Sequence, residues 1–173
     1  IKDLVLMKIS NMSSDTREQL DLAAASGVEF DLNLISSLSS NKDLDKLLIS
    51  NIVYQAEGNK GRFKHALFRE AVLSEILWSY KKKLNRLIAA DREANNGSPE
   101  EISRHWLNAN EFEKARKYLL KASQVSCRIH AYNDASVFAS KALEIWPEGQ
   151  DEDNRIETLI NLAHCLKVSG DLN

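Results

Sequence analysis

One short stretch near the middle of the chain, residues 52–72, constrains the fold more than any other. Residues 52–57 and 62–65 flank the turn Gly58-Asn59-Lys60-Gly61, which is typical of a β-hairpin because Gly and Asn adopt turn conformations readily. The chain then passes without a linker into a pattern of apolar residues spaced by three and four, beginning with Leu67 and Phe68. The sequence therefore predicts a short β-hairpin that is joined directly to a long amphipathic helix.

Helices are expected to make up most of the remaining chain. Glycine and proline, which interrupt helices, number only six and two among 173 residues. Apolar spacing before the hairpin predicts an extended link at 28–30 and helices over residues 3–12, 14–26, 32–38 and 41–51. Asp31 and Asn41 are expected N-caps, and Gly27 is an expected C-terminal stop. The run Ser13-Ser14-Asp15 can cap the helix that follows, and Asp15 and Glu18 have the spacing of a capping box.

The helix after the hairpin is predicted to run from about His65 to the Asn-Asn-Gly stop at 95–97. The residues that it is expected to bury are Leu67, Phe68, Ala71, Val72, Ile76, Tyr80, Leu84, Leu87 and Ile88. Its opposite side is a candidate basic docking face made of Lys81, Lys82, Lys83 and Arg86. Helices, a hairpin and a further helix in this order are the parts of a winged-helix domain, which we assign to residues 1–97.

A second domain is expected over residues 98–173. Ser98 and Pro99 form an N-cap and a first helical residue, followed by Glu100 and Glu101 in the first turn. A spacing of 20 residues then repeats: an aromatic residue and two alanines recur, and a proline follows. These residues are Phe112, Ala115 and Ala122, then Tyr132, Ala135, Ala142 and Pro147.

This aromatic–Ala–Ala–Pro pattern resembles the tetratricopeptide repeat, a helix hairpin of 34 residues. The resemblance places repeat starts near Asn96, Arg116 and Ile156, and the segment 112–130 then belongs to two repeats at once. An irregular helical bundle stays open as an alternative. The expected fold is therefore mainly α: a winged-helix domain with one small β-hairpin, followed by a right-handed helical-repeat array.

The tetratricopeptide resemblance also implies a binding groove along the first helix of each repeat. Leu120 and Ile160 are its expected apolar floor. The polar residues that it implies for a peptide or a small polar ligand are Glu100, Arg104, Asn108, Lys117, Gln124, Arg128, Glu157, His164 and Lys167.

Composition argues against several other functions. No apolar run approaches the ~20 residues of a membrane span, and two cysteines, Cys127 and Cys165, suit reduced thiols in a cytoplasmic protein. The first residue is Ile, so we expect an excised fragment, and the last repeat is expected to continue beyond Asn173. Leu159, Leu162 and Leu166 would then lack the helix that covers them.

No catalytic, cofactor or metal residues are predicted. The chain has no Gly-x4-Gly-Lys-Ser/Thr phosphate loop, so we expect no ATP binding, and its four histidines lack metal-ligand spacing. Nucleic acid is a disfavoured partner, because Lys42 and Lys46 on the third predicted helix are offset by Asp43 and Asp45.

The whole pattern resembles the arm of signal-transduction ATPases with numerous domains. The segments that carry the resemblance are 14–31, the hairpin, 63–76, the basic helix and 102–122. In particular, Phe63, His65 and Ala71 are similar to a Phe-x-His-Ala-Leu-x-x-Glu-Ala motif of large LuxR-type ATP-binding regulators. Leu73-Ser74 departs from these relatives, which often carry Tyr there.

This resemblance implies a non-catalytic regulatory role. An ATPase module would precede the fragment, the winged helix would pack on it, and the repeats would receive an inducer or a partner. A stand-alone interaction adaptor made of helical repeats is the alternative from the sequence, and a DNA-binding winged helix is a weaker one.

Overall fold

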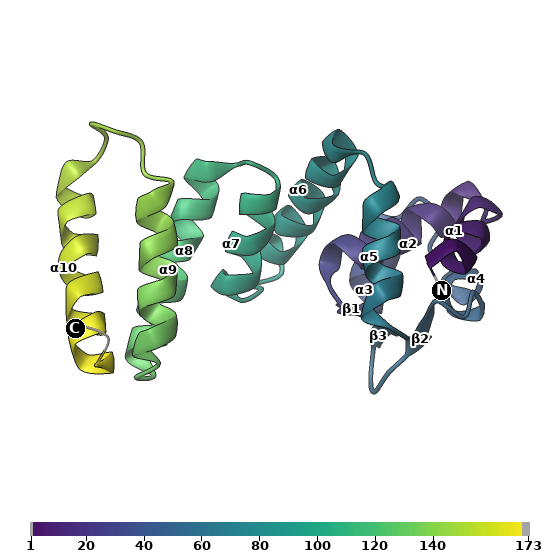
Figure 1. Cartoon of the computed structure of the whole chain (residues 1–173), viewed down its shortest axis with the longest axis horizontal. Coiled ribbons are helices and arrows are strands. Elements are labelled where there is room, and N and C mark those ends of the chain that lie inside the picture. Colours follow the sequence, from purple (N-terminus) through teal and green to yellow (C-terminus); the bar gives the residue numbers. More distant parts are fainter. Residues whose placement is uncertain (1, 171–173) are drawn as a thin grey trace. The chain divides into compact units, whose positions relative to one another are not determined.

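The chain divides between Asp91 and Arg92 into two compact units. The computed structural model describes residues 2–170, with side chains from Leu6 onward. Within that range it is mainly helical with one small antiparallel sheet of three strands (Figure 1). The expected mainly α fold with a small β element is therefore confirmed. The division falls inside the helix that precedes the boundary predicted at Ser98.

The two units contain consecutive elements of the chain. The first holds α1 (Lys2–Ser10), α2 (Ser14–Ser26), β1 (Glu29–Asp31), α3 (Leu32–Leu38), α4 (Asp45–Ile49), β2 (Val53–Gln55), β3 (Lys60–Phe63), α5 (Ala66–Glu75) and most of α6 (Trp78–Ala94). The second holds the end of α6 with α7 (Pro99–Asn108), α8 (Phe112–Arg128), α9 (Tyr132–Glu144) and α10 (Glu152–Ser169).

The sheet contains the predicted hairpin and one strand more. β2 and β3 pair antiparallel as expected, and β1 pairs with the other edge of β3, which gives the order β1-β3-β2. The extended link at 28–30 is therefore largely a strand, and the prediction of a lone hairpin was incomplete. Gly61 pairs with Phe30, and a Cβ at Gly61 would collide with the Phe30 ring. Glycine thus lets the Phe30 ring cover the sheet.

Two helix caps match the sequence predictions, and one predicted capping box does not form. Ser13, one of the three candidate caps, caps α2 by accepting from the Thr16 backbone N at 3.3 Å, whereas Glu18 accepts from Ser40 N at 2.9 Å and does not pair with Asp15. The predicted capping box was therefore wrong. Asp31 caps α3 as expected.

The predicted helix over 41–51 shrinks to the five residues of α4. Asn41 and Asp43 side chains accept from the backbone N of Asp43 and Asp45, at 3.0 and 2.9 Å. These local hydrogen bonds offer the backbone an alternative to the helix, so α4 begins late. The buried Gln19 secures the same loop by donating to the carbonyls of Asn41 and Asp43.

The long helix predicted after the hairpin is two helices. Ile76 has extended backbone angles (φ −80°, ψ 121°) and a buried side chain, so the chain changes direction there and α6 begins at Trp78. Two residues expected in the core are exposed instead: Leu67 by 61% and Leu87 by 38%. The core of the first unit is built from buried aliphatic and aromatic residues that include Leu20, Leu22, Phe30, Ile35, Leu47, Ile52, Phe63, Val72, Leu84 and Ile88.

In the second unit, α7, α8, α9 and α10 follow one another as antiparallel neighbours, each packed against the next (Figure 1). The four alanines of the repeat pattern are buried at the contacts: Ala115, Ala122, Ala135 and Ala142. The aromatic residue Phe112 is 48% exposed, so it does not fill an interhelical gap as expected.

The turns of this unit repeat as well. Asn110 and His130, 20 residues apart in the sequence, have φ angles of 59° and 61°. Each is followed by a backbone N–H that bonds five residues back, from Glu111 to Trp106 and from Ala131 to Ser126. This is the Schellman hydrogen bond of a helix end. α8 therefore makes equivalent turns and contacts with both α7 and α9.

Candidate functional site

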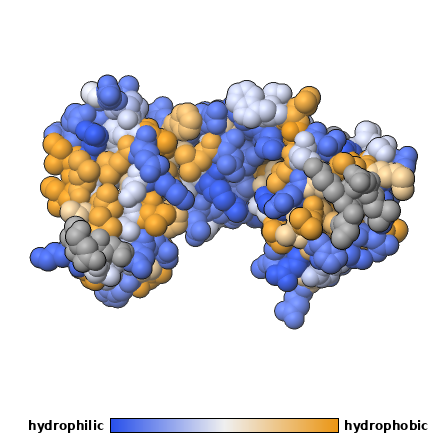
Figure 2. Space-filling model, viewed as in Figure 1, coloured by the Kyte–Doolittle hydropathy of each residue, from blue (hydrophilic) through white to orange (hydrophobic). Residues whose placement is uncertain are grey.

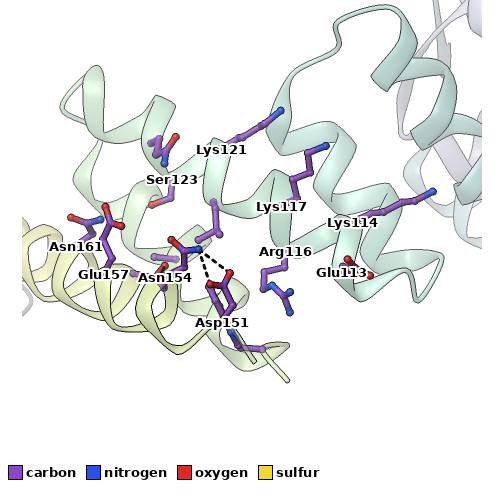
Figure 3. Close-up of a pocket in the computed structure, with 15 residues that line it drawn as sticks. Glu113, Lys114, Arg116, Lys117, Lys121, Ser123, Asp151, Asn154, Glu157 and Asn161 are labelled. Carbon is purple, nitrogen blue, oxygen red and sulfur yellow. Dashed lines mark hydrogen bonds between the residues drawn. The ribbon is translucent and has the colours of Figure 1, made fainter. Parts of the chain in front are cut away.

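A pocket of about 720 Å³ lies between α8 and α10, with Ala139 of α9 at its base. α8 and α10 both pack against α9, and side chains from both helices line the pocket. The residues that line the pocket are Glu113, Lys114, Arg116, Lys117, Leu120, Lys121, Ser123, Gln124, Ala139, Trp146, Asp151, Asn154, Glu157, Thr158 and Asn161 (Figure 3).

The α8 wall is basic. Lys114, Lys117 and Lys121 follow one another at spacings of three and four, so they share one side of the helix. Arg116 completes the set, and its guanidinium lies 4.8 Å from the centre of the Trp146 ring. This cation–π contact fixes the arginine at one end of the pocket.

The α10 wall carries acids and amides. Asp151 stands at the N-cap of α10 with φ 51°, and Asn154 Nδ2 donates to both of its carboxylate oxygens at 2.8 and 2.9 Å (Figure 3). Glu157 and Asn161 continue this wall along α10. Trp146 Nε1 donates to the carbonyl of Gln150 at 2.8 Å, which holds the loop that leads into α10.

The pocket therefore has two unlike walls. On the α8 side, Arg116 lies against Trp146, whereas the ammonium ends of Lys114, Lys117 and Lys121 extend away from α10 and form a basic edge to the pocket (Figure 3). The ammonium of Lys114 lies 4.2 Å from the centre of the Trp106 ring, and that of Lys121 lies 4.9 Å from the centre of the Tyr118 ring. The α10 side carries two carboxylates and two amides, and Glu113 adds one acid on the α8 side. Such an arrangement suits a polar ligand that presents acidic groups to one wall and hydrogen-bond donors to the other. Leu120 and Trp146 supply the apolar surface that such sites usually contain.

The predicted groove residues divide between two places. Lys117, Gln124 and Glu157 line the pocket together with the predicted floor residue Leu120, whereas Ile160 is 64% exposed and lies outside its lining. The other predicted groove residues also lie outside it: Glu100, Arg104 and Asn108 on α7, Arg128 at the end of α8, and His164 and Lys167 on α10.

Sequence reasoning missed Trp146, Asp151 and Asn154. They lie in the α9–α10 connection and in the first turn of α10, where the repeat pattern gives no register. One signal was present, since Asp is a favoured residue at the N-cap of a helix.

The candidate basic docking face on α6 is not uniform. Lys83 and Arg86 are exposed, whereas Lys81 and Lys82 are half-buried. The ammonium of Lys82 lies 3.4 Å from the centre of the Trp78 ring, and that ring is itself 67% exposed. Three consecutive residues of a helix point in different directions, so this run does not form one flat patch.

Tyr118 ties α8 to the end of α6 inside the second unit. Its hydroxyl donates to Glu93 Oε1 at 2.7 Å, and its side chain is buried. Burial, then the hydrogen bond and charge of Glu93, raise the pKa of Tyr118 to about 12. Next to Glu93, Arg92 Nε forms an ion pair with Glu101 Oε1 of α7 at 3.1 Å.

We expect Tyr118 to lose its proton at a higher pH than the other tyrosines of the chain. Because its folded pKa is raised from 10.0 to about 12, the stability that it contributes is full below pH 10 and is lost as the pH rises toward 12. The phenolate absorbance of the chain minus that of Tyr118→Phe should show a transition near pH 12. A difference transition near pH 10 would mean that the Glu93 contact does not form in solution.

No metal site or membrane span is evident in the part of the chain that the structure describes. No cluster of three or more His, Cys, Asp or Glu side chains there could hold a metal ion. None of the described helices combines the length and the apolar character needed to cross a bilayer. Comparisons with protein-family models, curated proteins and solved structures gave no match.

Proposed function

We propose that this chain is a non-catalytic regulatory and interaction region of a larger signalling protein, and that the α8–α10 pocket receives its ligand. The observation that carries the proposal is the unlike lining of the two sides, with a basic edge of four cations on α8 and the carboxylates and amides of α10. The ligand class that fits is an extended acidic peptide segment or a small acidic molecule. A cofactor has no role in this function.

The topology of the first unit supports a winged-helix assignment. Its order α2-β1-α3-α4-β2-β3, with sheet order β1-β3-β2, has three helices and a hairpin wing in the sequence that such domains use. A DNA-binding role gains little support, because α4 has five residues and Lys46 follows Asp45 directly. Few cations can then reach phosphates from this helix. We therefore propose that this unit contacts protein, including a nucleotide-binding module of the same polypeptide.

The second unit supports a tetratricopeptide-like array through its repeated turns and its buried alanines. The two units together support the proposal that this chain is the arm of a cytoplasmic signalling ATPase of the LuxR-regulator type. A stand-alone adaptor is the second candidate, because the pocket lies wholly within the second unit. A phosphate-loop module encoded in the same reading frame would favour the arm, and a frame without one would favour the adaptor.

Charge reversal in the basic wall tests the pocket. Fluorescently labelled extended peptides, one series rich in Asp and Glu and one of neutral composition, are titrated with the chain and followed by anisotropy. We expect the acidic series to bind and Lys117→Glu with Lys121→Glu to weaken it by roughly tenfold or more, since attraction becomes repulsion.

Lys141→Glu is the matched control, because Lys141 is exposed on α9 and does not line the pocket. Its binding should stay close to that of the unaltered chain. Equal losses in Lys141→Glu and in the pocket variant would indicate nonspecific charge attraction. Failure of all acidic peptides to bind would contradict the proposed ligand class.

A further inference from the structure

The two cysteines of the chain come from the two helices that form the pocket walls. Cys127 lies on α8 and is half-buried, and Cys165 lies on α10 and is only 3% exposed. Both helices pack against α9 as antiparallel neighbours, so they run in the same direction (Figure 1). Positions on α8 can therefore be matched with positions on α10 at the same level along the pocket.

That register brings the cysteines opposite one another. On α8, Gln124 lines the pocket, and Cys127 lies three residues further on the same side. On α10, Asn161 lines the pocket, and Cys165 lies four residues further on the same side. The two thiols thus follow the last pocket residues of each wall.

The two side chains also interact. Burial, followed by the charge and the hydrogen bond of the neighbouring Cys127 thiol, raises the pKa of Cys165. A disulfide requires Cα atoms about 4.4–6.8 Å apart, so closing the bond draws α8 and α10 to that spacing at this level.

We propose that Cys127 and Cys165 are a thiol pair that closes reversibly to a disulfide joining α8 to α10 beyond the end of the pocket. The oxidant class is a small disulfide such as oxidised glutathione. The Cys127 thiolate attacks one of its sulfurs, and one glutathione thiolate leaves. The Cys165 sulfur then attacks Cys127 Sγ and gives its proton to the departing sulfur of the second glutathione, which leaves as a thiol.

The exposure of the two residues sets this order. Cys127 is the more accessible sulfur and meets the oxidant first, whereas the buried Cys165 is reached only from Cys127. The overall change is two protein thiols and one glutathione disulfide giving one protein disulfide and two glutathione thiols. A glutathione pool poised toward reduction reverses it, as expected of a transient cytoplasmic switch.

Closure would also change the pocket, and this effect on ligand binding rests on the proposed function. A covalent bond one turn beyond Gln124 and Asn161 fixes the spacing of the two walls at that end. Ligand affinity should therefore differ between the oxidised and the reduced chain, while formation of the bond needs no ligand.

The experiment treats the chain at low concentration with oxidised glutathione and measures intact mass and free thiols. We expect a monomer that is lighter by two hydrogen atoms, has no free thiol, and returns to two thiols with dithiothreitol. Its Tm should rise by on the order of 5–15 °C, because the unfolded chain is constrained.

Single variants separate the two roles. Cys165→Ser should stop at the mixed disulfide on Cys127, and Cys127→Ser should leave Cys165 unmodified because that thiol is buried. A stable mixed disulfide in the unaltered chain, a disulfide-linked dimer, or two persistent thiols would each overturn the proposal. Loss of peptide binding without loss of disulfide formation would overturn only the proposed pocket function.

Discussion

Replacing Ala135 with Leu should destabilise the second unit by about 1–3 kcal/mol. Ala135 is fully buried on α9, and its carbonyl accepts a hydrogen bond from Ser123 Oγ of α8 at 2.8 Å. The backbones of α8 and α9 are therefore close at this position, and three further carbon atoms cannot enter without separating the helices. Hydrogen exchange read by mass spectrometry would report the loss of protection in peptides from α8 and α9.

Ala163→Leu is the matched control for this change. Ala163 lies in the middle of α10, as Ala135 lies within α9, but its side chain is exposed. The two variants share the same change in helix propensity, so the difference between them reports overpacking alone. A neutral Ala135→Leu would mean that α8 and α9 do not pack through this alanine.

Local signals in the sequence predicted much of the fold. Ser98 and Asp31 form the expected caps, because capping depends on a few adjacent residues. The buried alanines were predicted because their spacing records the contact between neighbouring helices. Gly58 occupies the turn of the hairpin with φ 64°, a conformation that glycine adopts without strain.

The features that the sequence did not reveal depend on distant contacts. β1 has three residues and no alternation long enough to detect, and its pairing to β3 joins residues about 30 positions apart. The break at Ile76 has no glycine or proline nearby to signal it, and it follows from burial of the isoleucine in a core that distant segments complete. Tertiary packing overrides helix propensity at such points.

The site was predictable only on one side. A repeat register can propose Lys117 and Gln124, because α8 continues a periodic pattern. The opposite wall depends on how the α9–α10 connection places Trp146 and Asp151, and a connection of irregular length has no register to follow. The thiol pair was hidden for the same reason, since 37 residues separate its members in the sequence.

Replacing Gly61 with Ala should destabilise the first unit by about 1–3 kcal/mol. The new Cβ would lie 2.6 Å from Phe30 Cζ and in contact with Cε2 of the same ring. That ring is buried and meets Phe63 edge-on at 5.8 Å, so it cannot move aside without disturbing the core. Alanine is otherwise the better residue in a strand, so a gain in stability would show that the collision does not occur.

Gly58→Asn tests the turn of the same hairpin without this collision. Nothing lies within 4 Å of the position that a Cβ at Gly58 would take, and Asn tolerates the positive φ found there. We expect hydrogen exchange in β1, β2 and β3 to stay nearly unchanged in this variant and to accelerate in Gly61→Ala. Equal acceleration in both variants would mean that any substitution in the hairpin unravels it, and that the Phe30 contact with Gly61 does not hold β1 in the sheet.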